Sequence, residues 1–359
     1  MKLNSKYMRT EEKVIFALRE LYTKYGYVQF KMSKFEEYDL YVRNKDFLVS
    51  DSVITFNDTN GKLLALKPDV TLSIIKNSTD DASTVQKLYY NENVYRVSKN
   101  THSFKEIMQT GLECIGDVNT YNICEVLSLA AKSLAAISDD YILDISHMGL
   151  ISSVLEGIDE DNKKLILKYI SEKNTHDLQA LCEKEGINST VISTLISVNG
   201  TAEEIKQKLS QIAFADASRD ALCDIFETAD IIKELPESEH IRFDFSIIND
   251  MNYYSGIVFK GYIEGIPTGI LTGGRYDLLM NKMGKRSAAI GFAVYLDFLE
   301  RFMEEKSEYD TDILLLYKEG DNLSDVLKTV AALTSQGNRV TAERDIPNNL
   351  KYKTLLRFE

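Results

Sequence analysis

Apolar residues recur at helical spacing near the start of the chain. Within residues 11–25 they fall on one stripe of a helix: Val14, Leu18, Leu21, Tyr22 and Tyr25. Gly26 follows directly, and glycine commonly ends a helix because it adopts the left-handed backbone conformation at low cost. The spacing predicts an amphipathic helix over 11–25 with this stripe facing a core.

A turn signal then separates two short apolar runs. Asn60-Gly61 lies inside the segment 54–66, and both residues tolerate the positive φ of a tight hairpin turn. Pro68 ends the second run, and the Asp69 carboxylate can cap a helix that begins near Thr71. The segment therefore predicts a β-hairpin followed by a short helix.

Further along, strand-like and helix-like patterns separate into blocks. Strands are predicted over 87–97 and 107–115, and a helix over 121–138. From 151 to 238 the spacing is helical, with helices over 162–171, 175–185 and 202–213. Strands resume at 242–247, 251–262 and 269–272, and Gly273-Gly274 is predicted to break the last of them. Near the end of the chain, a β-α-β unit is predicted over 312–317, 323–336 and 339–343.

Strands on both sides of a helical insertion indicate an α+β fold with an antiparallel sheet flanked by helices. The predicted division has four parts: a first part of the core over 1–150, a helical insertion domain over 151–238, a second part of the core over 239–305, and a short β-α-β segment over 306–359.

Charge and composition narrow the possible partners. Lys and Arg number 42 against 55 Asp and Glu, a net charge of −13, which disfavours binding to nucleic acid. No apolar run is long enough to span a membrane, and the N-terminus has no apolar signal segment, so we expect a cytoplasmic protein. The four cysteines form no CxxC pair, so we expect reduced thiols and no metal site or cofactor.

Polar residues gather at the edges of the predicted core strands. Gln109 and Glu113 lie four apart on one strand, so the two-residue period places both on the same face. Taken alone, such a pair most often points to solvent. Other polar residues occur at strand ends: Asp69, Thr71, Arg96, Tyr253, Tyr254 and the 273–277 turn. Carboxylates and an amide can bind an ammonium group, and tyrosine hydroxyls can hydrogen-bond an imidazole, so the set suits a small zwitterion.

Five ordered segments resemble the catalytic core of class II histidyl-tRNA synthetases over about residues 5–302. They are ITFNDTNGKLLALKPD (54–69), Tyr95-Arg96 with KEIMQTGLE (105–113), NYYSGIVF (252–259), GGRYD (273–277) and AIGFA (289–293). The resemblance implies the class II synthetase fold, with a histidine pocket formed by the matching segments.

Three departures concern the ATP chemistry of that family. Asn249 stands where the synthetases have a histidine-specific arginine, Phe298 replaces the motif 3 arginine, and Ser98 replaces the motif 2 glutamate. Adenylation develops negative charge on phosphates, and positioned cations supply much of the stabilisation. The resemblance therefore extends to the amino-acid pocket more than to the nucleotide site.

A synthetase-like core that keeps recognition but loses catalytic cations resembles the regulatory subunits of ATP phosphoribosyltransferase. The stretch NDMNYYSGIVFKGY (249–262) is similar to that family in particular. The resemblance implies histidine-binding residues and a vestigial nucleotide site. The histidine contacts that the resemblance implies are Asp69, Thr71, Gln109, Glu113, Tyr253, Tyr254 and Tyr276, and the vestigial nucleotide site that it implies is Arg96 and Arg275.

The same resemblance implies a non-catalytic role in the first step of histidine biosynthesis. The expected partner is the short-form ATP phosphoribosyltransferase catalytic subunit, in a hetero-octamer built on a homodimeric core, with L-histidine as the effector. Two alternatives remain at this point. One is an amino-acid-activating, ligase-like paralogue of histidyl-tRNA synthetase, favoured by Arg96 and Arg275, and the other is a tRNA-binding module, disfavoured by the negative charge.

Overall fold

The computed structural model describes residues 8–45, 48, 53–80, 84–97, 103–251, 253–299 and 308–359. The chain divides into two compact units, Met1–Met303 and Glu304–Glu359. Each unit is described by itself, and the finer division into four parts stays a prediction.

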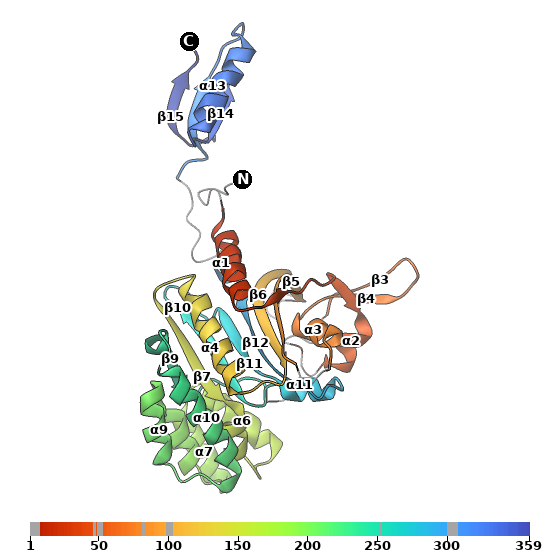
Figure 1. Ribbon diagram of the computed structural model, residues 1–359, viewed down its shortest axis with the longest axis vertical. Helices are drawn as coiled ribbons and strands as arrows, with labels where there is room; N and C mark the ends of the chain where they lie inside the picture. Colours follow the sequence, from red (N-terminus) through yellow and green to blue (C-terminus); the bar gives the residue numbers. More distant parts are fainter. Residues whose placement is uncertain are drawn as a thin grey trace. The chain divides into compact units, whose positions relative to one another are not determined.

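The first unit contains both helices and strands, with a run of consecutive helices from α5 to α8 (Figure 1). Its α-helices are α1 (Thr10–Lys24), α2 (Tyr38–Arg43), α3 (Thr71–Asn77), α4 (Thr120–Ala135), α5 (Met148–Val154), α6 (Glu160–Ser171), α7 (Thr175–Glu185), α8 (Thr190–Ser197), α9 (Ala202–Ser210), α10 (Arg219–Ile232) and α11 (Asp277–Lys282). Its strands are β1 (Val28–Gln29), β2 (Phe35–Glu37), β3 (Thr55–Asn57), β4 (Leu63–Leu66), β5 (Gln86–Val97), β6 (Phe104–Gly116), β7 (Tyr141–His147), β8 (Asn199–Gly200), β9 (Ile241–Asp244), β10 (Ile257–Ile263), β11 (Leu271–Arg275) and β12 (Ala288–Tyr295).

One large sheet organises this unit. In the described residues its strand order is β1-β5-β6-β12-β11-β10-β7-β9-β8. Most neighbours are antiparallel, whereas β1–β5 and β7–β9 are parallel pairs, so the sheet is mixed rather than purely antiparallel. The predicted α+β class is confirmed.

Alternation along β6 separates two hydrophobic cores on the two faces of the sheet. Leu112 and Cys114 face the core that α1 and α4 cover, whereas Ile115 belongs to the core that α3 and α11 help to form. Because side chains alternate along a strand, Gln109 and Glu113 share the face of Ile115. The α3 and α11 face therefore carries the polar residues that the sequence singled out.

The helix and hairpin predicted near the N-terminus are confirmed. Helix α1 buries Val14, Leu18 and Tyr22 and ends just before Gly26, whose φ is +82°. Strands β3 and β4 pair antiparallel around a turn in which Gly61 has a φ of +78°. The apolar stripe of the helix and the Asn60-Gly61 turn therefore predicted the local structure correctly.

Two predictions about the later strands are wrong. Gly273-Gly274 does not break a strand, because β11 runs through both residues. A Cβ on Gly273 would lie 2.5 Å from the Phe292 Cβ, so glycine permits close packing here instead of a turn. Strand β10 begins at Ile257 rather than at 251, because the preceding residues form a turn with N–H groups donating to the Asp250 carbonyl.

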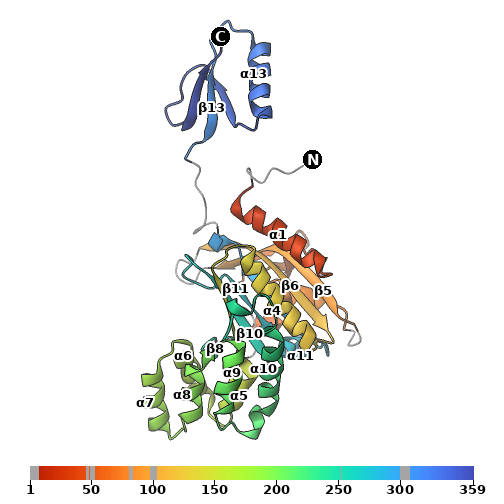
Figure 2. The same cartoon turned by 60° about the vertical axis from the view of Figure 1, so that its left-hand side comes forward.

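The region 148–232 is mainly helical, as predicted, and Figure 2 shows α6 to α10 grouped together. Helix α10 packs against α4, which ties this region to the large sheet. The helices predicted over 162–171, 175–185 and 202–213 correspond to α6, α7 and α9. The two-residue strand β8 was not predicted; it pairs with β9 at the sheet edge.

The second unit contains the predicted β-α-β and one further strand. Helix α13 (Leu323–Ser335) connects β13 (Thr311–Leu316) to the parallel strand β14 (Val340–Glu343). Strand β15 (Tyr352–Arg357), which the sequence pattern did not predict, pairs parallel to β13 on its other side. The result is a three-stranded parallel sheet of order β14-β13-β15.

The cysteines are free thiols: Cys114, Cys124 and Cys182 are buried and Cys223 is exposed. Among the helices described, none combines the length and the apolar character that a membrane crossing requires.

Candidate functional site

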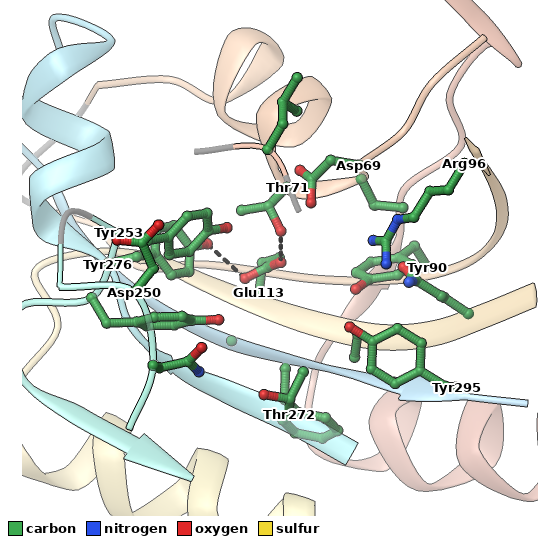
Figure 3. Close-up of a pocket in the computed structure, with 18 residues that line it drawn as sticks. Asp69, Thr71, Tyr90, Arg96, Glu113, Asp250, Tyr253, Thr272, Tyr276 and Tyr295 are labelled. Atoms are coloured by element: carbon green, nitrogen blue, oxygen red, sulfur yellow. Dashed lines mark hydrogen bonds between the residues drawn. The ribbon is translucent and has the colours of Figure 1, made fainter. Parts of the chain in front are cut away.

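A cavity of about 410 Å³ opens on the α3 and α11 face of the large sheet. Strands β5, β6, β11 and β12 form part of its wall, and the loops before α3 and β10 complete it (Figure 3). Its lining comprises Leu48, Asp69, Val70, Thr71, Tyr90, Arg96, Gln109, Glu113, Asn249, Asp250, Tyr253, Tyr254, Thr272, Tyr276, Gly291, Phe292, Ala293 and Tyr295.

Glu113 lies at the centre of the polar lining and is 2% exposed. The Thr71 hydroxyl donates a hydrogen bond to its Oε1 at 2.9 Å, and the Tyr276 hydroxyl donates to its Oε2 at 2.6 Å (Figure 3). Burial raises the pKa of the Glu113 carboxyl to about 8, against the lowering effect of the two hydroxyls. The side chain is therefore held in one orientation by residues far apart in sequence.

A glycine on the next strand makes room for this carboxyl. Gly291 pairs with Glu113 across β12 and β6, and a Cβ at Gly291 would lie 1.8 Å from Glu113 Oε2. The same Cβ would lie 2.5 Å from the carbonyl oxygen of Leu112, which as backbone cannot move aside easily. Any larger residue at 291 would displace the carboxyl from its place.

Asp69 and Arg96 lie together toward another part of the cavity. The Asp69 Oδ1 accepts from the N–H of Leu72 at 2.9 Å, which is the helix-capping role predicted for it. Burial raises the pKa of Asp69, while this hydrogen bond and the Arg96 charge oppose the rise. Arg96 Nε donates to the Pro68 carbonyl at 3.0 Å, so the guanidinium is anchored to the loop that carries Asp69.

Three tyrosines form an aromatic wall beside Glu113. The rings of Tyr253 and Tyr254 have centroids 4.5 Å apart, and those of Tyr253 and Tyr276 are 5.8 Å apart. Gly274 permits this packing, because a Cβ there would lie 2.7 Å from the Tyr254 ring. The wall offers a flat apolar surface next to a carboxyl, an arrangement that suits a planar ligand ring with an N–H group.

Gln109 supplies a hydrogen-bonding group without a protein partner. It is 3% exposed, and its amide nitrogen has no hydrogen-bond partner in the described part of the chain. Buried polar groups are normally satisfied, and leaving one unsatisfied costs about 1–3 kcal/mol. An amide that lines a cavity in this state is positioned to bond a ligand.

The structure brings together most of the residues predicted for the site. The seven predicted histidine contacts and Arg96 all line the cavity. Arg275 is not among the lining residues; its Nε donates to Asp277 Oδ2 at 2.8 Å. The cavity thus shows where these side chains converge, and their roles toward a ligand stay predictions.

Among the lining residues that carry a hydroxyl or carboxyl group, four were not singled out as ligand contacts from the sequence: Tyr90, Asp250, Thr272 and Tyr295. Register explains two of them. Tyr90 pairs with Gly111 and Tyr295 pairs with Gln109, so each lies beside the face that bears Gln109 and Glu113. The sequence shows which residues of one strand share a face, but it does not show which residues of neighbouring strands lie side by side.

The positions that depart from the synthetase motifs also have defined surroundings. Asn249 lines the cavity. Phe298 packs against the hydrophobic core, with its ring 6.3 Å from that of Tyr295. Ser98 lies outside the described residues. No group of three or more His, Cys, Asp or Glu side chains within the described ranges is arranged to hold a metal ion.

The fold and the cavity define a protein with a class II aminoacyl-tRNA synthetase-like core. The family model described as histidyl-tRNA synthetase matches residues 2–299. The chain therefore belongs to the histidyl-tRNA synthetase family, and the fold predicted from its motifs is confirmed.

Among its relatives, the chain is similar to the ATP phosphoribosyltransferase regulatory subunit of Clostridium kluyveri, with 28% identity over 337 residues, 89% of this chain and 85% of the relative. Two solved structures share the fold. One, of an ATP phosphoribosyltransferase regulatory subunit/histidyl-tRNA synthetase from Bacillus halodurans, has a TM-score of 0.79 and 22% identity, covering 97% of this chain and 93% of that one. The other, the ATP phosphoribosyl transferase (HisG:HisZ) complex from Thermotoga maritima, has a TM-score of 0.63 and 19% identity, covering 82% and 98%. The predicted resemblance to these regulatory subunits is confirmed.

Proposed function

We propose that this chain is the non-catalytic regulatory subunit of an ATP phosphoribosyltransferase. In this role it activates the short-form catalytic subunit in the cytoplasm and transmits feedback inhibition by L-histidine. The partner assembles with it into a hetero-octamer around a homodimeric core of this chain. The names of the relatives support the regulatory role, and the cavity supports the effector site.

One observation carries the proposal: the cavity brings together the residue types of an amino-acid pocket, while a position that the synthetases use for nucleotide chemistry, outside the cavity lining, is altered. Thr71, Glu113 and Tyr276 form a closed hydrogen-bonded set, whereas Phe298 presents an aromatic ring where the synthetases have an arginine. Transfer of AMP needs cations against the phosphates, and removal of one such stabilising group typically costs about 10²–10³ in rate. A pocket that binds without reacting suits an effector sensor.

In this proposal the imidazole ring lies against the tyrosine wall, with its N–H groups near Glu113. The ammonium group lies near Asp69 and Thr71, and the Gln109 amide bonds a remaining polar group of the ligand. Feedback requires that histidine bind the inhibited assembly better than the active one. Such coupling between sites is typically about 1–3 kcal/mol.

The test is formation of phosphoribosyl-ATP by a short-form catalytic subunit from the same source, with and without this chain, across a histidine titration. We expect activation by the chain and its reversal by histidine. The variant Gln109→Ala should raise the histidine concentration for half-inhibition about tenfold, since one buried hydrogen bond is lost, while assembly persists. The exposed Gln179→Ala on α7 is the matched control and should behave as wild type.

Three results would contradict the proposal. Unchanged inhibition of the Gln109→Ala complex would remove the cavity as the effector site. Histidine-dependent exchange of pyrophosphate into ATP by the chain alone would instead favour the ligase-like alternative. A chain that leaves the catalytic subunit unaffected at saturation would retain only the fold of its family.

A further inference from the structure

Acidic side chains outnumber cationic ones in the described lining of the cavity. Among the described residues that line it, Asp69, Glu113 and Asp250 carry carboxyl groups, and Arg96 is the one cation. Glu113 is buried, Asp69 is half-buried and Asp250 is exposed at the rim. A zwitterionic amino acid brings one positive and one negative group into this surface, and only the positive group finds several complementary partners.

Arg96 is already engaged by the protein. Its Nε donates to the Pro68 carbonyl, and its charge lies close enough to Asp69 to oppose the rise of that carboxyl's pKa. Tyr295 lies against it as well, since the Arg96 charge opposes the effect of burial on the tyrosine pKa. A ligand carboxylate would have to share this guanidinium with an acid of the protein, which weakens the gain from the contact.

On the opposite wall, the residues that the structure describes include no second cation. Asn249, a neutral side chain, lines the cavity next to Asp250. An anionic ligand group near this wall meets an amide and a carboxylate, and like charges at short range disfavour binding. The neutral donor of Gln109 does not restore the balance, because an amide N–H bonds a hydroxyl or a carbonyl oxygen as well as a carboxylate oxygen.

Building on the proposed function, we propose that the site recognises the ammonium and imidazole groups of its ligand and not the carboxylate. The preferred ligand class is then a cationic imidazole amine whose carboxyl is replaced by a neutral group, such as the amino alcohol or the amide of histidine. Histidine itself binds through the same two groups, and its carboxylate adds little. Asn249 and Asp250 determine this preference.

Titration calorimetry on the full chain in low salt tests the ligand class. The ligands are L-histidine, L-histidinol, which lacks the carboxylate, and imidazolepropionate, which lacks the ammonium group. We expect histidinol to bind as tightly as histidine or up to tenfold more tightly, and imidazolepropionate at least tenfold more weakly. Histidinol binding more than threefold more weakly than histidine, or imidazolepropionate binding within tenfold of histidine, overturns the inference while leaving the histidine site intact. No binding by any of the three contradicts the effector site of the proposed function, and the inference with it.

A set of variants tests whether Asn249 and Asp250 determine the ligand preference. Asn249→Arg supplies the missing cation and should shift the ratio of histidinol to histidine affinity at least tenfold toward histidine. Asn281→Arg, exposed on α11 and outside the lining, is the matched control and should leave the ratio unchanged. If Asn249→Arg does not fold, Asp250→Asn at the exposed rim should shift the same ratio at least threefold toward histidine. If a folded variant has the same ratio of histidinol to histidine affinity as the Asn281→Arg control, the assignment of the preference to Asn249 and Asp250 is overturned.

Discussion

Two hollows of the first unit are lined by the same kinds of side chain, but these side chains differ in how deeply they are buried. The cavity over β6 and a groove at the ends of β7, β9 and β10 are each lined, in the residues described, by three carboxylates, one arginine and tyrosines. The groove has a volume of about 530 Å³ and comprises Asp140, Tyr141, Ile142, Glu239, His240, Arg242, Tyr262, Ile263 and Glu264. Neither size nor composition therefore distinguishes the candidate site.

Burial distinguishes it. Glu113 is 2% exposed, whereas the Glu239 side chain in the groove is 81% exposed. Exposed ionic groups are hydrated and screened, so a new partner gains little from them. Residues of the groove also satisfy one another: His240 stacks on Tyr141 at 4.2 Å, and its Nδ1 lies 3.1 Å from the Tyr141 carbonyl oxygen. The cavity is the candidate binding site because its polar groups are already desolvated and one of its amide nitrogens, that of Gln109, has no hydrogen-bond partner among the described residues.

The largest expected effect comes from filling the space that the cavity needs. Gly291→Ala places a Cβ against Glu113 and the Leu112 carbonyl, so we expect a loss of about 3 kcal/mol in the free energy of unfolding. Gly256→Ala is the matched control, because its Cβ would meet only the flexible Arg275 side chain, at 3.2 Å. Urea unfolding of both variants measures the difference. Equal stabilities would mean that the carboxyl is not confined as described.

A pH effect that is smaller, for each pH unit, than this loss separates the two hollows. The pKa of Glu113 is raised to about 8 from an ordinary value of 4.5, so between these values the folded chain binds a proton that the unfolded chain has lost. The contribution of Glu113 to the free energy of unfolding, measured as wild type minus Glu113→Gln, should therefore be fully present below about pH 4.5. It should fall as pH rises toward 8, by at most about 1.4 kcal/mol per pH unit.

Urea unfolding at several pH values between 4 and 9 checks this dependence. Glu239→Gln in the groove is the control and should keep the wild-type profile, since its side chain is exposed. A Glu113→Gln protein with the same pH profile as wild type would show that the carboxyl titrates as if in water.

The smallest effect compares two tyrosine hydroxyls. Tyr276→Phe removes the donor to Glu113 Oε2 and should cost about 1–2 kcal/mol of stability, because a buried acceptor loses its partner. Tyr262→Phe in the groove should change stability by about 0.5 kcal/mol or less, since Tyr262 is only half-buried. Thermal unfolding of the pair gives the comparison, and an equal cost for both hydroxyls would remove the distinction between the hollows.

Local patterns predicted much of the fold and part of the site. The stripe of α1 and the turn around Gly61 were legible because a helix and a hairpin depend on neighbouring residues. The shared face of Gln109 and Glu113 followed from alternation alone. Gly273-Gly274 was misread as a break, because a missing side chain predicts a turn and close packing equally well until the facing residue is known.

By itself, the sequence determined many of the elements that form, the shared strand face of Gln109 and Glu113, and which motifs of the histidyl-tRNA synthetase family are kept or changed. Only the tertiary structure decided that Tyr90 and Tyr295 join the site through strand register, and that Glu113 is enclosed by Thr71, Tyr276 and Gly291. The physical reason is range. Periodicity and turn chemistry act over a few residues, whereas desolvation, and with it a raised pKa and an unsatisfied amide, arises from segments that meet only when the chain has packed.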